Sequence, residues 1–79
     1  MQEQDIYTAL NEIFSDVLDE ENIDLRPETT ADDIEEWNSL SHIELVSAIE
    51  QHFGIRFTSR EIMMWRNVGE MVATILERL

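Results

Sequence analysis

The apolar residues of the chain recur at helical rather than strand spacing. From about Asp5 to Leu18 they follow one another at intervals of three and four, with acidic residues on the other side. This pattern predicts an amphipathic helix whose buried stripe is made by Ile6, Leu10, Ile13, Phe14, Val17 and Leu18. Val, Ile and Thr alternate with polar residues nowhere for long enough to predict a sheet.

A second helix is predicted from about Ser39 to His52. Asn38 is a favoured N-cap residue, and Gly54 stands just past the end, where a left-handed residue is wanted. Leu40 and Ile43 lie toward one side of the apolar stripe, where full burial is not required. The stripe itself is made by Leu45, Val46, Ile49 and Phe53.

Two further helices are predicted in the last third of the chain. Thr58 followed by Glu61 fits a capping box that opens a short helix through Trp65. Asn67 followed by Glu70 marks the start of the other. The apolar face of this last helix is made by Val68, Met71, Val72, Ile75, Leu76 and Leu79.

Residues 19–38 lack helical periodicity and predict a long loop. Pro27 disfavours helix at the residue before it, and Thr30 can cap a short turn. The isolated apolar residues of this segment, which we expect to hold it against the core, are Ile23, Leu25 and Ile34. The whole pattern predicts an all-α fold, a small bundle of three main helices plus one short helix with a long first loop, forming a single domain over residues 1–79.

Acidic side chains dominate the charge of the chain. Its 79 residues include 18 Asp or Glu against 5 Lys or Arg, for a net charge of −13, while 43% of the residues are hydrophobic, enough for a folded core. Such a surface repels nucleic acid and anionic membranes and attracts partners with Lys or Arg patches. Solubility alone is the other explanation of the charge.

Cysteine is absent, which excludes disulfides and thiolate sites. The first residues lack the basic and apolar regions of a signal peptide, and no apolar run reaches transmembrane length. We therefore expect a cytoplasmic protein that binds neither nucleic acid nor membrane.

Neither a metal site nor a self-contained active site is predicted. The acidic window 19–30 fails as an EF-hand, because its fifth, sixth and twelfth positions hold Ile23, Asp24 and Thr30. Ser39 and His42 are neighbours on one helix, but a hydrolase also needs an orienting group and an oxyanion hole, and no Gly-rich loop supplies that hole. We expect no enzyme activity and a surface position for His42.

Ser39 is the strongest candidate for chemistry. It stands where the long loop meets the second helix, and a capping role is its simplest explanation. Asn38 is the better cap candidate, however, which leaves the Ser39 hydroxyl free to face solvent. A helix N-terminus also offers unpaired N–H groups and a partial positive charge, so a phosphodiester is tolerated there.

The segment Trp37–Leu40 resembles the Asp-Ser-Leu signature of the acyl carrier protein family, a subset of which has Trp before it. The similarity continues through 43–46 and 53–55, and the segments around Glu61 and 67–72 resemble the third and fourth helices of the family. Together these segments span nearly the whole chain. Asn38 departs from the usual Asp, and the missing charge puts Mg²⁺-assisted loading in doubt.

The resemblance implies that a phosphopantetheinyl transferase attaches 4'-phosphopantetheine to Ser39, and that the arm carries acyl groups as thioesters to acyl-processing enzymes with basic patches. The cargo is left open between fatty acyl, polyketide and amino acid, so an aminoacyl or peptidyl carrier is an alternative. An unmodified acidic helical interaction module is another, kept open by Asn38. Successive partners imply a monomer, and the family's partner-facing positions correspond to Leu40, Ile43, Glu44, Ser47 and Glu50.

The methionines of the last two helices allow two interpretations. Their helical spacing favours ordinary core filling. The alternative is that their flexible side chains line a deformable cavity for an acyl chain. These residues are Met63, Met64 and Met71.

Overall fold

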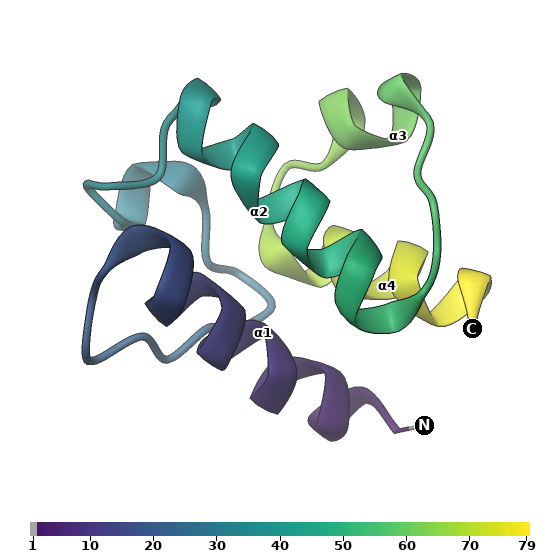
Figure 1. Ribbon diagram of the computed structural model, residues 1–79, viewed down its shortest axis with the longest axis horizontal. Helices are drawn as coiled ribbons and strands as arrows, with labels where there is room; N and C mark the ends of the chain where they lie inside the picture. Colours follow the sequence, from purple (N-terminus) through teal and green to yellow (C-terminus); the bar gives the residue numbers. More distant parts are fainter. Residues whose placement is uncertain (1) are drawn as a thin grey trace.

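The computed structural model describes residues 2–79, and its ordered elements are all helical (Figure 1). They are α1 (Glu3–Leu18), the single 3₁₀ turn η1 (Ala31–Asp33), α2 (Ser39–Phe53), α3 (Ser59–Met64) and α4 (Val68–Arg78). The predicted all-α bundle with one short helix and a long first loop is confirmed. Within the described residues no helix has the length and apolar character needed to cross a membrane.

The caps that bound these helices are the predicted ones. Asn38 begins α2, Thr58 begins α3 and Asn67 begins α4, each through a side-chain oxygen that accepts backbone N–H groups of the first turn. Gly54 ends α2 in the left-handed region at φ 66°. The first helix starts two residues before the predicted Asp5, whose carboxylate accepts the Gln2 N–H at 3.2 Å.

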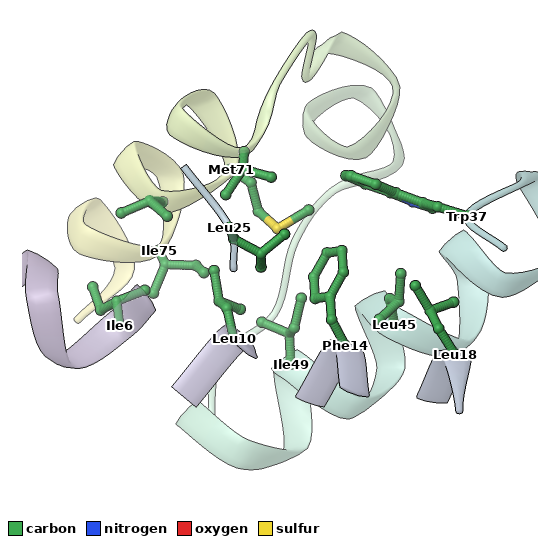
Figure 2. Packing of buried hydrophobic residues seen from close by; sticks show 12 residues of the cluster. Ile6, Leu10, Phe14, Leu18, Leu25, Trp37, Leu45, Ile49, Met71 and Ile75 are labelled. Atoms are coloured by element: carbon green, nitrogen blue, oxygen red, sulfur yellow. The ribbon is translucent and has the colours of Figure 1, made fainter. Parts of the chain in front are cut away.

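The core lies where α1 packs against both α2 and α4. Phe14 sits in the middle of this cluster, with Leu10, Leu45 and Ile49 close by (Figure 2). Leu76 and Leu79 are exposed, contrary to the prediction, because Ile75 already fills the inward direction at the end of α4 and Leu79 lies beyond the last helical residue. The remaining apolar positions of α4 are buried as predicted.

The core-filling interpretation of the methionines is confirmed for Met71 and wrong for the other two. Met71 is buried, whereas Met63 is 83% exposed and Met64 is 65% exposed. Both belong to α3, which has six residues, buries none of them fully, and lies on the side of the molecule away from α1 (Figure 1). A helix of this length is too short to display a buried stripe, so the spacing of its apolar residues carries no information about burial.

The long loop is fixed to the helices by backbone hydrogen bonds as well as by apolar contacts. Leu25 is buried, and its N–H donates to the Asn11 Oδ1 of α1 at 2.8 Å. The first turn of α4 donates two further N–H groups to the loop, from Val68 to the Thr29 carbonyl and from Gly69 to the Pro27 carbonyl, each at 2.9 Å. These bonds hold the middle of the loop, residues 25–29, against α1 and α4.

Replacing Gly54 by Ala tests the end of α2. A Cβ here meets no atom within 4 Å, so the cost comes from the left-handed backbone alone. We expect Gly54→Ala to lower the free energy of unfolding by about 1 kcal/mol, measured by urea denaturation. Gln51→Ala, an exposed change in the same helix, serves as control and stays within about 0.5 kcal/mol of the wild type. Equal stability of the two variants contradicts the account.

Candidate functional site

Ser39 is the first residue of α2 and is exposed. The neighbouring residues cap the helix: Asn38 Oδ1 accepts the N–H groups of Leu40 and Ser41 at 3.0 Å each. Ser41 Oγ in turn accepts the Asn38 N–H at 2.9 Å and donates to the Glu36 carbonyl at 2.9 Å. No hydrogen bond of the Ser39 hydroxyl is found within residues 2–79, so this oxygen is free for chemistry, as expected.

The N-terminus of α2 differs in one respect from the expectation. Asn38 already holds the N–H groups of Leu40 and Ser41, and the His42 N–H bonds the Asn38 carbonyl at 2.8 Å. These donors are therefore not available to a phosphate on Ser39. What remains for an anion at this position is the Ser39 N–H, which makes no hydrogen bond within residues 2–79, and the partial positive charge of the helix end.

Trp37 anchors the entry into α2. Its side chain is buried, and its ring meets the Phe14 ring edge-on, with centroids 5.0 Å apart. On the other side its indole Nε1–H donates to His42 Nδ1 at 3.0 Å. The residue two positions before Ser39 is thus fixed both to α1 and to α2.

His42 is not the surface histidine predicted from the sequence. Its ring is half-buried, stacks on Trp37 with centroids 5.9 Å apart, and lies near the backbone carbonyl of Ile62 on α3. Burial lowers the pKa of His42 below 6.5, partly offset by the Ile62 carbonyl. Since Nδ1 accepts from Trp37, it is not available as a base for Ser39, which agrees with the absence of a hydrolase site. The one sequence signal for this contact was the spacing of Trp37 and His42, which stand five residues apart at the start of a predicted helix.

An open cavity of about 500 Å³ lies beside Ser39. Its walls are largely apolar and aromatic, and they come from the end of the loop, α2, α3 and the start of α4; they include Trp37, Ser39, His42, Ile43, Met63 and Trp65. Trp65, which follows α3, is half-buried and donates its indole N–H to Thr74 Oγ1 at 2.9 Å. A free hydroxyl at the mouth of such a cavity fits a residue that bears a long flexible prosthetic arm.

The predicted partner-facing positions lie along α2. Leu40, Ile43, Glu44 and Ser47 are exposed. Glu50 is half-buried, and its Oε2 accepts the Phe57 N–H at 2.8 Å, so it also holds the connection between α2 and α3.

Met63 and Met64 add exposed apolar area on α3 that sequence reasoning missed. Met63 and Ile43 line the same cavity, which makes the apolar surface continuous from α2 to α3. The part of the chain that the structure describes holds no group of three or more His, Asp or Glu placed to bind a metal ion.

Comparison with known proteins identifies this arrangement. A family described as a phosphopantetheine attachment site matches residues 8–75. An acyl carrier protein of Acidothermus cellulolyticus is 33% identical over 72 residues, which cover 91% of this chain and 86% of that protein. The chain belongs to the acyl carrier protein family. It is accordingly a carrier and not an enzyme, and 4'-phosphopantetheine is its prosthetic group.

A solved structure supports the same assignment. The solution structure of a holo acyl carrier protein from Geobacter metallireducens is similar to this carrier with a TM-score of 0.85 and 38% sequence identity. The similarity covers 91% of this chain and 83% of the other.

We expect the half-buried His42 to make the stability of the carrier depend on pH. The folded-state pKa of His42 is below its ordinary value of 6.5, so the unfolded chain binds the proton more tightly. The contribution of neutral His42 is therefore complete above the unfolded pKa and is lost as pH falls toward the lowered pKa. We expect His42→Gln to cost about 1 kcal/mol at neutral pH and to lose less stability than the wild type on acidification.

The measurement is urea denaturation at about pH 7.5 and about pH 5.5, on either side of the ordinary histidine pKa. The many carboxylates of the chain affect wild type and variant alike, so the difference between the two isolates His42. His52→Gln, at an exposed histidine of the same helix, is the control and keeps the wild-type profile. Parallel profiles for wild type and His42→Gln rule out the assigned role.

Proposed function

We propose that Ser39 is the residue that carries the arm, attached by a phosphopantetheinyl transferase through a phosphodiester bond to Ser39 Oγ. One observation at the start of α2 supports this most strongly. Asn38 caps the helix, so the Ser39 hydroxyl stays exposed and makes no hydrogen bond within residues 2–79. When bound, the arm supplies a thiol that holds acyl groups as thioesters. Trp37 and the capped first turn keep Ser39 in a fixed position for each partner enzyme.

Asn38 in place of the family's Asp bears on loading rather than on folding. Asn and Asp cap helices equally well, and Asn38 makes both cap hydrogen bonds here. The missing negative charge weakens interaction with the Mg²⁺ of a transferase. Slow loading of the natural protein is therefore compatible with a carrier function.

Replacing Ser39 tests the attachment site directly. We expect the wild type, incubated with coenzyme A, Mg²⁺ and a broad-specificity phosphopantetheinyl transferase, to gain one phosphopantetheine by intact mass, and Ser39→Ala to gain none. Ser59→Ala, at an exposed serine that begins α3 and lies outside the proposed docking face, loads like the wild type. The stability of Ser39→Ala stays within about 0.5 kcal/mol of the wild type, because no hydrogen bond is lost.

The Asn38→Asp variant separates slow loading from no loading. If this variant gains mass faster than the wild type, Asn38 in place of Asp affects how fast the arm is loaded. If neither protein gains the arm, the attachment proposal is wrong, and the unmodified interaction module, which uses the acidic α2 to bind a basic protein, takes its place.

The surface around Ser39 forms the proposed partner-docking face. It comprises Leu40, Ile43, Glu44, Ser47 and Glu50 on α2, and we add Met63 and Met64 on α3. The apolar members supply contact area at the centre, and the net charge of −13 draws in enzymes with basic patches around their entrances. Family membership implies the transferase and acyl-processing enzymes as partners. The monomeric state, the cytoplasmic location and the single domain over 1–79 stay predictions.

Reversing one charge on this face tests the role of Glu44. We expect Glu44→Lys to lower kcat/KM of the transferase by about tenfold at low salt, because encounter is steered by opposite charges. Added salt reduces the difference. Glu77→Lys makes the same change in net charge at an exposed position of α4 and is the control. Equal losses in the two variants indicate a general effect of net charge and contradict a specific α2 face.

A further inference from the structure

Two adjacent methionines of α3 hold their thioether groups in solvent. Met63 is 83% exposed and Met64 is 65% exposed, whereas Met71 of α4 is 1% exposed. The chain has no cysteine, so the thioether sulfur is its most readily oxidised side-chain group. Within residues 2–79 the sulfur atoms that an oxidant meets first are therefore the two neighbours on α3.

Open cavities give a small oxidant access to this pair. Met63 lines the cavity beside Ser39. Together with Met64 it also lines a second open cavity of about 600 Å³, whose walls come from α3, the residues that follow it and α4. With this degree of exposure, a molecule as small as hydrogen peroxide can reach both sulfur atoms without any opening of the fold.

The attachment of α3 to the rest of the protein does not depend on the two sulfur atoms. The Glu61 carboxylate pairs with the Arg78 guanidinium of α4. Directly after the helix, the Trp65 indole donates to Thr74 Oγ1 at 2.9 Å. An oxygen atom added to either methionine breaks neither of these contacts and enters no part of the core, so we expect the oxidised protein to stay folded.

We propose that Met63 and Met64 form a modification site, at which hydrogen peroxide converts the thioethers reversibly to sulfoxides and thereby weakens the docking of partner enzymes. In each step a sulfur lone pair takes one oxygen from the peroxide, whose O–O bond breaks and which leaves as water. The sulfur loses the two electrons that the peroxide gains. A methionine sulfoxide reductase reverses the change with electrons from a dithiol, which becomes a disulfide.

The expected consequence follows from the position of the pair on the surface. Both methionines and the exposed Ile43 of α2 supply apolar contact area on the proposed docking face. A sulfoxide is polar, and its oxygen has to give up bound water when a partner covers it. This consequence rests on the proposed docking face, whereas the place of oxidation follows from exposure alone.

Peptide mass spectrometry tests where the oxygen is added. The full-length protein is treated with hydrogen peroxide, the excess is removed with catalase, and the protein is digested with trypsin. Cleavage after arginine places the methionine pair in residues 61–66 and Met71 in residues 67–78. We expect fragment ions to show oxygen on both methionines of the first peptide before the second peptide gains any. Equal rates in the two peptides, or oxidation of Trp65 in place of the methionines, overturn the proposal.

Loading by the phosphopantetheinyl transferase tests the effect on docking. We expect peroxide treatment of the wild type to lower kcat/KM of the transferase by about fivefold, and methionine sulfoxide reductase to restore it. The double variant Met63→Leu/Met64→Leu keeps apolar area but lacks the sulfur, so its treated and untreated samples load equally. Met71→Leu, a change of similar volume in the core, is the matched control and loses activity on treatment as the wild type does.

An unchanged kcat/KM in the oxidised wild type overturns the proposal. An equal loss in the double variant also overturns it, because the oxygen then acts elsewhere, and so does unfolding of the oxidised wild type seen by circular dichroism. A wild type that fails to load before treatment contradicts the proposed attachment and, with it, the weakened docking of the transferase. The peptide result then still decides whether the pair is the site of oxidation.

Discussion

The hydrogen bond from the Trp37 indole to His42 fixes the place where the long loop becomes α2. Trp37 is at the same time packed edge-on against Phe14 of α1, so the entry into α2 is tied to the core. His42 extends the connection to the Trp65 ring, which follows α3, at a centroid distance of 6.2 Å. The carrier needs such a connection because Ser39, the proposed attachment site, makes no side-chain hydrogen bond within residues 2–79 that would hold it. Position at the site is therefore supplied by the residues on either side of the serine.

A carrier protein needs a rigid surface where partner enzymes bind and an accessible hydroxyl where the arm is attached. In this structure different residues meet the two requirements. Capping by Asn38 and Ser41 stiffens the first turn without using the Ser39 hydroxyl. The surface beyond it combines exposed apolar side chains with a strongly acidic molecule. This combination suits brief encounters, since charge accelerates approach while a small apolar contact area permits release.

Local sequence signals predicted most of the fold. The caps at Asn38, Thr58 and Asn67 and the left-handed Gly54 depend on a few adjacent residues, and all appear where expected. The burial of His42 was not predictable in this way, because the groups that cover it come from the loop before α2 and from α3. Helical periodicity describes one element and cannot say what another element places over its flank.

The same limit explains the exposed methionines of α3 and the two exposed leucines at the end of α4. In each case the local pattern was compatible with burial, and the arrangement of neighbouring helices decided against it. The exposed position of Ser39 at a capped helix start was predictable because it depends only on adjacent residues. The rings beside it, Trp37, His42 and Trp65, were not, since they come from the long loop, from α2 and from the residue that follows α3.

The central claim is that Ser39, rather than a neighbouring hydroxyl, bears the phosphopantetheine arm. Tandem mass spectrometry of the loaded protein tests this most directly, through backbone fragments that separate Ser39 from Ser41 and Ser47. The account predicts that the added mass is carried by fragments that contain Ser39 and is absent from those that contain only the later serines. Added mass on Ser41 or Ser47 would contradict it.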